Sequence, residues 1–249
     1  LRPALTGAVV WSVTVREPTI VRHGPKRLGR VLKGRRLAEV RRHGKRLMLE
    51  FGPNAVLNVH LGMTGALMLQ EPGTALEKHT HLVFRFDGDG PQLRFVDPRR
   101  FGGVWLGEPP SGRFSAGLGP DALAIGLRDF RKLVARNRQA KALLMDQAVI
   151  AGLGNIYCDE ALFQARVHPL TPGSQLPQDQ VARLHRAMKK ILNDAIAARG
   201  STIRDYRDSD GSAGAFQLRH KVYGREGQPC TACGPALVRI QFAYRSTHL

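Results

Sequence analysis

The chain is poor in cysteine and in acidic residues, and it has no long apolar run. Three cysteines among 249 residues are too few for a disulfide framework, so we expect a reducing compartment. No apolar run approaches the ~20 residues that a membrane-spanning helix needs. The opening residues, Leu1-Arg2-Pro3-Ala4, do not have the pattern of a secretory leader. These absences argue against the secreted disulfide-rich and transmembrane classes.

Basic residues greatly outnumber the acidic ones. The 38 Lys and Arg residues face only 20 Asp and Glu residues, which gives a formal net charge of +18. Such a charge favours a polyanionic partner, with nucleic acid as the first candidate; a solvated basic surface or a membrane-surface binder is the alternative. The length and the 43% hydrophobic content suffice for one or two domains with their own cores.

The period of the apolar residues changes along the chain. Short alternating segments between Gly and Pro turns indicate strands, at 47–51, 55–60, 82–86 and 93–96. Helical spacing follows, and Pro177 and Gly200 can bound one long helix. We therefore predict an α+β protein with a β-sandwich or barrel at 1–118, a helical domain at 119–205, and a loop with a cysteine turn at 206–249.

Two glycines interrupt the helical region. Gly152 and Gly154 are expected to break one helix and to let the next begin near Asn155. The free N–H groups of such a helix start attract phosphate. The alternative is a plain helix–turn–helix in which the glycines serve packing.

Cys230 and Cys233 lie on a Gly- and Pro-rich turn with the spacing of half a zinc ribbon. The other half is not visible, because Cys158 is far away in sequence. A redox or incidental pair is the alternative.

Four motifs in order carry a resemblance to a known family. They are NVHLGMTG at 58–65, DPRRFG at 97–102, AGLGNIY at 151–157 and KVYGR at 221–225. From Leu1 to Leu249 the chain resembles the formamidopyrimidine-DNA glycosylase family. The resemblance implies a base-excision repair enzyme that flips out and removes oxidised purines, such as 8-oxoguanine and formamidopyrimidines, from duplex DNA. It also implies a β-sandwich, a helix–two-turn–helix domain and a zinc hairpin.

The resemblance implies a mechanism as well. An N-terminal proline amine attacks the sugar, and the Schiff base then undergoes β- and δ-elimination. A terminal amine titrates near ~8, below the ~10.4 of lysine, so a useful fraction is nucleophilic at neutral pH. The family's opening Pro-Glu segment would precede Leu1, and its second Cys pair would follow Leu249. A chain that truly began at Leu1 should form no Schiff base. One that ended at Leu249 would hold at most half a zinc site in a poorly ordered hairpin. We therefore expect a longer native chain.

Family roles carry over residue by residue. Lys45 matches the proton donor for β-elimination, and Arg245 matches the hairpin arginine of δ-elimination. Met63, Arg99 and Phe101 match the trio that fills the gap left by the flipped nucleotide. The other DNA contacts implied are His60, His79, Arg136, Gly154 and Asn155, with Arg138 as the alternative to Arg136. Thr202 and Tyr206 are candidates for the lesion pocket, and Cys230 and Cys233 for one structural Zn²⁺.

Each of these residues also has a structural interpretation. Lys45 and Arg245 could be ordinary surface cations, and Met63 and Phe101 could be core residues. Two other functions stay open. One is the sister endonuclease VIII type, which removes oxidised pyrimidines; the Met63, Arg99 and Phe101 trio and the loop at 208–216 favour the purine enzyme. The other is a non-catalytic binder of damaged DNA. We expect a monomer that binds duplex DNA containing oxidised bases or abasic sites, with no membrane partner, in the bacterial cytoplasm at the nucleoid.

Overall fold

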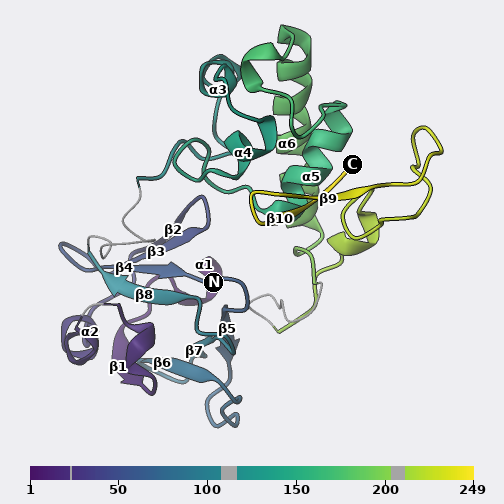
Figure 1. Ribbon diagram of the computed structural model, residues 1–249. Coiled ribbons are helices and arrows are strands. Elements are labelled where there is room, and N and C mark those ends of the chain that lie inside the picture. Colours follow the sequence, from purple (N-terminus) through teal and green to yellow (C-terminus); the bar gives the residue numbers. More distant parts are fainter. Residues whose placement is uncertain (23, 108–116, 203–210) are drawn as a thin grey trace. The chain divides into compact units, whose positions relative to one another are not determined.

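The computed structural model describes residues 1–22, 24–107, 117–202 and 211–249 (Figure 1). The described residues belong to two compact units. The β unit comprises Leu1–Ala116 with Thr202–Gly214, and the helical unit comprises Gly117–Ser201 with Ala215–Leu249. Segments far apart in sequence thus join the same unit, and the three-part division at 118 and 205 stays a prediction. Within the described ranges, no helix combines the length and the apolar character needed to cross a membrane.

Two four-stranded antiparallel sheets form the β unit, which confirms the predicted sandwich. One sheet has the order β1-β6-β7-β5 and the other β2-β3-β4-β8. The strands are β1 (Val10–Val15), β2 (Glu39–His43), β3 (Arg46–Glu50), β4 (Val56–His60), β5 (Ala66–Gln70), β6 (Thr80–Phe86), β7 (Gln92–Val96) and β8 (Gly103–Leu106). Short helices accompany them, namely α1 (Arg2–Leu5), η1 (Pro18–Ile20) and α2 (Pro25–Leu32).

The core of the β unit lies between these sheets. Leu82 and Phe95 of one sheet and Leu49 and Leu57 of the other are fully buried in a single cluster. The inward-facing apolar side chains of the strands form this cluster, and β4, β6 and β7 bury consecutive residues as well. Pairing of β4 with β8 sets His60 opposite Gly103. The loop after β4 and the loop before β8 therefore lie at the same end of this sheet.

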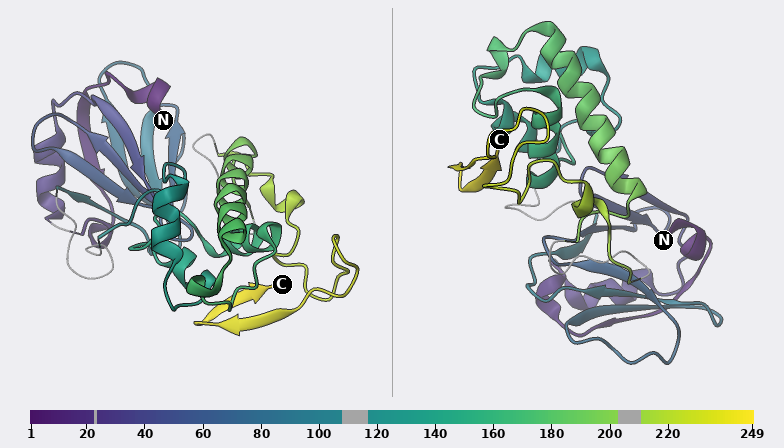
Figure 2. Two further views of the ribbon diagram at one scale, coloured as in Figure 1. Left: turned by 90° about the horizontal axis from the view of Figure 1, so that it is seen from above. Right: turned by 90° about the vertical axis from the view of Figure 1, so that its right-hand side faces the viewer.

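The helical unit contains α3 (Leu127–Val134), α4 (Ala140–Met145), α5 (Asn155–Ala165), η2 (Gly173–Gln175), α6 (Gln178–Ala197) and η3 (Phe216–Arg219), followed by the hairpin of β9 (Arg239–Phe242) and β10 (Arg245–His248). The long helix predicted between Pro177 and Gly200 is α6, seen lengthwise in Figure 2. Leu184 and Met188 lie on its buried face. Gly200, with φ +89°, follows the C-terminal end of α6, and its N–H donates to the carbonyl oxygen of Ala195.

The predicted start of α5 at Asn155 is confirmed, but the expected end of the preceding helix is wrong. Helix α4 stops at Met145, well before Gly152. The carboxylate of Asp146 accepts the N–H of Ala148 at 3.0 Å, a local bond that competes with the helical one. A tight turn therefore separates α4 from the glycines.

Candidate nucleic-acid interface

Three loops of the β unit meet at one buried carboxylate, that of Asp97. Its Oδ1 accepts from Thr64 Oγ1 at 2.6 Å, and its Oδ2 accepts from the N–H of Gly102 at 2.8 Å. The N–H of Asp97 itself donates to His79 O at 3.1 Å. Asp97 is completely buried. One side chain thus fastens the loop at 61–65 to the loop at 97–102, and its backbone holds His79 beside them.

The first two loops also touch through their backbones. Gly62 has φ +68°, and a Cβ atom there would lie 2.6 Å from the backbone N of Gly102. No side chain fits in that space. The glycine of the NVHLGMTG motif is therefore required by a close approach between two loops rather than by a turn alone.

This arrangement holds two apolar side chains in solvent. Met63 is 65% exposed and Phe101 is 39% exposed. The guanidinium carbon of Arg99 lies 4.5 Å from the ring centroid of Phe101, a cation–π distance. Neither Met63 nor Phe101 is a core residue. Their exposure beside an arginine suits contact with DNA, although their individual roles stay predictions.

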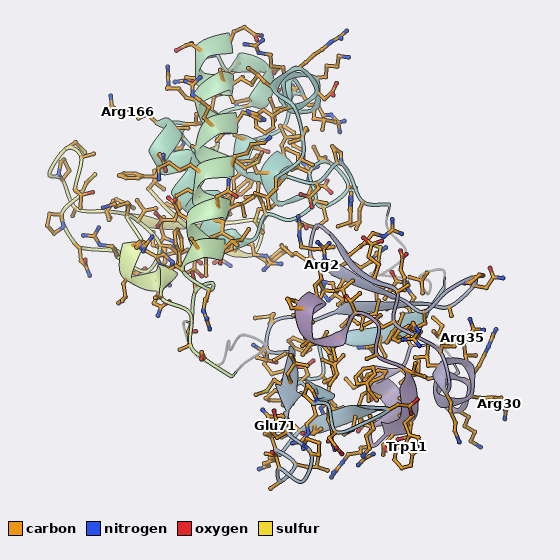
Figure 3. The ribbon with its side chains drawn as sticks, turned by 180° about the vertical axis from the view of Figure 1, so that it is seen from behind. Arg2, Trp11, Arg30, Arg35, Glu71 and Arg166 are labelled. Atoms are coloured by element: carbon orange, nitrogen blue, oxygen red, sulfur yellow. The ribbon has the colours of Figure 1, made fainter. Side chains whose placement is uncertain are left out.

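The other predicted residues of the β unit lie around these loops. His60 ends β4, and its Nδ1 accepts the N–H of Gly62 at 3.0 Å, so part of its role is to shape the loop. His79 is exposed with φ +72°. Lys45 is exposed in the tight turn between β2 and β3, where Gly44 has φ +57°. Two exposed residues of the β unit lie beyond these loops. Arg30 projects outward from α2, and Trp11 of β1 is 59% exposed (Figure 3).

In the helical unit, the start of α5 is tied to the hairpin. Gly154 is the N-cap of α5. The side chain of Asn155 donates from Nδ2 to Ser246 O at 2.9 Å, next to the exposed Arg245. The predicted phosphate contact of Asn155 and the predicted hairpin arginine therefore lie in neighbouring segments.

A buried ion pair fixes the base of the hairpin. Lys141 of α4 donates from Nζ to Asp159 Oδ1 at 2.7 Å, to Ser246 O at 2.7 Å and to Thr247 Oγ1 at 2.8 Å. Asp159 of α5 also accepts from the N–H and the Nδ1 of His248. Lys141 and Asp159 are each 1% exposed. Strand β10 is thus locked onto α4 and α5 through charged and polar contacts.

Glu160, the next residue of α5, holds the segment that leads to the cysteine turn. Its buried carboxylate accepts the backbone N–H groups of Lys221, Val222 and Tyr223 at 2.9 to 3.0 Å. A buried carboxylate with this many donors is well satisfied. The KVYGR motif is therefore attached to α5 through its backbone.

The alternatives Arg136 and Arg138 have different surroundings. Arg138 donates to Asp146 Oδ2 at 2.6 Å, and this hydrogen bond holds the pKa of Asp146 below its usual value. Arg136 is exposed, and its charge also contributes, less than Arg138 does, to lowering the pKa of Asp146. This difference favours Arg136 as the cation available to a phosphate.

The two candidates for the lesion pocket are Thr202 and Tyr206. Thr202 lies at the edge of its loop, and its Oγ1 accepts the N–H of Gly214 at 2.8 Å. Tyr206 lies outside the described residues.

The cysteine turn has the local geometry of a thiolate site. The N–H of Ala232 donates to Cys230 Sγ at 3.4 Å, and this bond together with the N–H of Cys233 lowers the pKa of Cys230. The pKa of Cys233 is raised, chiefly by its hydrogen bond to Cys230. Both thiols line a cavity of about 700 Å³ together with His248. Among the described residues, no group of three or more His, Cys, Asp or Glu side chains could hold a metal ion, and the zinc site stays a prediction.

Comparison with known proteins decides the family. The family model for the formamidopyrimidine-DNA glycosylase N-terminal domain matches residues 1–104, and the model for the H2TH domain of the same family matches residues 117–207. The chain belongs to the formamidopyrimidine-DNA glycosylase family. The formamidopyrimidine-DNA glycosylase of Laribacter hongkongensis is 42% identical over 252 residues, covering 99% of this chain and 92% of the relative.

Solved structures of the family have the same fold. The Lactococcus lactis Fpg in complex with DNA containing an abasic site matches with a TM-score of 0.88 at 33% identity, covering 100% of this chain and 93% of that one. The MutM (Fpg) protein of Thermus thermophilus matches with a TM-score of 0.83 at 39% identity, covering 99% and 91%. The predicted fold class and family are therefore confirmed.

Within each unit, the residues that hold its loops or its hairpin in place were not predicted from the sequence. Asp97 is part of a quoted motif but received no role, and Lys141, Asp159 and Glu160 were not singled out. One signal could have found the two acids of α5: adjacent carboxylates follow the glycine turn in a chain with few acids and much positive charge. Asp and Glu are mostly exposed and are almost never fully buried unless they are paired, so this signal is weak.

Replacing Asp97 by alanine should uncouple the loops. The substitution leaves Thr64 Oγ1 and the Gly102 N–H without their acceptor, so we expect a loss of about 3 kcal/mol in the free energy of unfolding. Affinity for lesion-containing duplex should fall as well, because Met63 and Phe101 lose their fixed positions. Urea unfolding and fluorescence anisotropy measure the two effects. Asp87→Ala, in an exposed turn of the same unit, is the control. An unchanged stability of Asp97→Ala would contradict the bridging role.

His220 predicts a dependence of stability on pH. It is buried, with its Nε2 at 3.2 Å from Ser201 Oγ and its ring against Phe216 and Tyr223. Burial lowers the pKa of His220. The negative charge of Glu160 and a backbone hydrogen bond with Tyr223 partly oppose this shift, and the nearby His248 adds to it. Because the unfolded chain then binds more protons than the folded one below about pH 6.5, the free energy of unfolding should fall as the pH drops through that value. Urea unfolding between pH 5 and 7.5 should show a weaker dependence in His220→Gln; parallel profiles would refute the assignment.

Proposed function

We propose that this chain is a base-excision DNA glycosylase with abasic-site lyase activity that removes oxidised purines, such as 8-oxoguanine and formamidopyrimidines, from duplex DNA. The observation that carries the proposal is the set of loops fastened to Asp97, which present Met63, Arg99 and Phe101 to solvent. Family relatives support it, because solved complexes contain DNA with an abasic site, with Fapy-dG or with carbocyclic 8-oxo-G.

The exposed trio suits the flipping of a nucleotide. Unstacking a base costs a few kcal/mol, and apolar wedges inserted into the gap offset part of that cost. Met63 and Phe101 supply the wedges, and Arg99 supplies hydrogen-bond donors for the orphaned partner base. Because the guanidinium already lies over the Phe101 ring, wedge and donor are positioned together.

Phosphate contacts come from both units. His60 and His79 serve in the β unit, while Arg136, Gly154 and Asn155 serve in the helical unit. The start of α5 offers free N–H groups and the positive end of a helix dipole. Contacts of this kind set the register on DNA without reading its sequence, and they make the affinity fall steeply with salt.

The chemistry is acid–base and nucleophilic. An amine, which the family resemblance assigns to an N-terminal proline, forms a Schiff base with the sugar. Lys45, which is exposed in the two-residue turn between β2 and β3, serves as the proton donor of β-elimination. Arg245 neutralises the phosphate in δ-elimination. Thr202 and Tyr206 belong to the pocket for the extruded base.

Cys230 and Cys233 would hold one structural Zn²⁺. The backbone N–H groups that lower the pKa of Cys230 favour the thiolate that the metal requires. The metal would stabilise the hairpin and take no part in the reaction. We further propose that the enzyme acts as a monomer at the nucleoid of the bacterial cytoplasm.

Borohydride trapping on a duplex with one 8-oxoguanine opposite cytosine tests the activity. We expect a covalent protein–DNA adduct and cleavage of the lesion strand. A parallel duplex with an oxidised pyrimidine should give much less adduct, and the reverse preference would favour the endonuclease VIII type. Salt-sensitive binding without an adduct would indicate a non-catalytic binder of damaged DNA. Absence of both binding and adduct would refute the proposal.

A further inference from the structure

The tip of the C-terminal hairpin has an unusual residue for its backbone conformation. Phe242 pairs with Arg245, so Ala243 and Tyr244 alone form the turn between β9 and β10. Their φ angles are +49° and +58°. Two consecutive left-handed residues define the hairpin turn that Asn and Gly prefer. A tyrosine in this region is a genuine outlier, because its Cβ atom crowds the neighbouring carbonyl oxygen.

The rest of the helical unit does not compensate for this strain. Tyr244 is 97% exposed, so its ring gains no burial from the fold. Glycine at the same position would relieve the backbone at no loss of packing. An unfavourable conformation that brings no internal contact points to an external one.

The surroundings of the tip indicate the chemistry of that external contact. The next residue is Arg245, also exposed, and its successor Ser246 is held by Lys141 Nζ and Asn155 Nδ2. The backbone next to the tip is therefore held at the start of α5, and the exposed Tyr244 and Arg245 are adjacent in the chain. An exposed ring beside an arginine suits nucleic acid, in which every base and sugar offers an apolar face next to a phosphate.

We propose that Tyr244 is a DNA-contacting residue whose ring packs on the face of a base or deoxyribose next to the phosphate bound by Arg245. The inference rests on the proposed function, since duplex DNA is the partner in both. It adds a contact that depends on an aromatic face rather than on charge. The ring should strengthen binding without altering its dependence on salt.

Three substitutions at position 244 separate the ring from the backbone. Tyr244→Gly removes the ring and relieves the strain, Tyr244→Ala removes the ring and keeps a Cβ atom, and Tyr244→Phe keeps the ring without the hydroxyl. We expect Tyr244→Gly to unfold at a higher temperature than the wild type yet to bind a duplex with a stable abasic-site analogue about tenfold more weakly. Tyr244→Ala should bind as weakly as Tyr244→Gly. Tyr244→Phe should bind within about twofold of the wild type.

Two controls sharpen the test. Leu218→Ala removes another highly exposed apolar side chain of the same unit, 84% exposed, and should leave the affinity unchanged. The slope of log Kd against log salt should stay the same in Tyr244→Gly, whereas Arg245→Ala should reduce it by about one.

The outcomes distinguish this inference from the proposed function. A wild type that binds the duplex together with a Tyr244→Gly variant of equal affinity would overturn the role of Tyr244 alone. A Tyr244→Phe variant as weak as Tyr244→Gly would overturn the contact through the ring. A Tyr244→Gly variant that unfolds at a lower temperature would show that the tyrosine serves the fold. Absence of duplex binding by the wild type would overturn both proposals.

Discussion

Replacing Lys45 by alanine should lower the rate of strand cleavage at an abasic site by about 10²- to 10⁴-fold. This range is the usual contribution of a positioned proton donor. Lys45 lies exposed in the turn after Gly44, so its loss leaves no cavity and should not unfold the β unit. The measurement is single-turnover cleavage of a duplex with one abasic site, followed by gel electrophoresis. The affinity for a stable abasic-site analogue should change far less than the rate.

Two further variants define the role of Lys45. Lys45→Arg keeps the positive charge but donates a proton poorly at neutral pH, because the pKa of arginine lies far above that of lysine. It should therefore bind DNA like the wild type and cleave slowly. Lys33→Ala removes another exposed lysine of the same unit and should leave the rate unchanged. If Lys45→Ala cleaved as fast as the wild type, Lys45 would be an ordinary surface cation.

Replacing Lys141 by methionine should cost about 3–5 kcal/mol in the free energy of unfolding of the helical unit. Removal of one partner of a buried ion pair leaves the other charge uncompensated. Here the loss of Nζ leaves the buried carboxylate of Asp159 without its cation and removes one donor each from Ser246 O and Thr247 Oγ1. Asp159 keeps only its contacts with His248, and Ser246 O keeps Asn155 Nδ2. Urea unfolding followed by circular dichroism measures the effect. The hairpin should detach at a lower urea concentration than the helices, because two of the three contacts of Lys141 join β10 to α4.

A matched pair on the surface is the control for Lys141. Lys190 and Asp194 form an exposed ion pair one turn apart on α6, at 2.6 Å. Lys190→Met should change the free energy of unfolding by less than about 1 kcal/mol. The double variant Lys141→Leu with Asp159→Leu should cost less than Lys141→Met, since no charge is then left buried. A Lys141→Met variant with near wild-type stability would contradict the anchoring role.

Local patterns account for the elements that the sequence predicted well. Alternating apolar residues marked β3, β4, β6 and β7, because every second side chain of a strand faces the core. The spacing of apolar residues by three or four positions from Val181 onward predicted α6, because residues so spaced lie on one face of a helix. The end of α4 was misjudged, since the bond from the N–H of Ala148 to Asp146 is not visible in hydrophobic spacing.

Exposure decided between the two interpretations of Met63 and Phe101. In the sequence, an apolar residue beside a strand is indistinguishable from a core residue. In the fold both side chains are exposed, on two loops whose backbones meet at Gly62 and Gly102. The resemblance of the motif singled out these two residues, and their roles stay predictions; the structure adds that neither belongs to the core.

By itself, the sequence determined the family, the α+β class, the positive charge and the start of α5, because these depend on composition, motifs and short-range periodicity. Only the tertiary structure decided how the site is held together. Asp97 reaches Thr64 across 33 positions of the chain, and Lys141 reaches Thr247 across 106. Polar contacts at such separations have no periodic signature. A buried carboxylate or ammonium finds its partners only when the chain folds, since desolvation makes an unpaired charge too costly to keep inside.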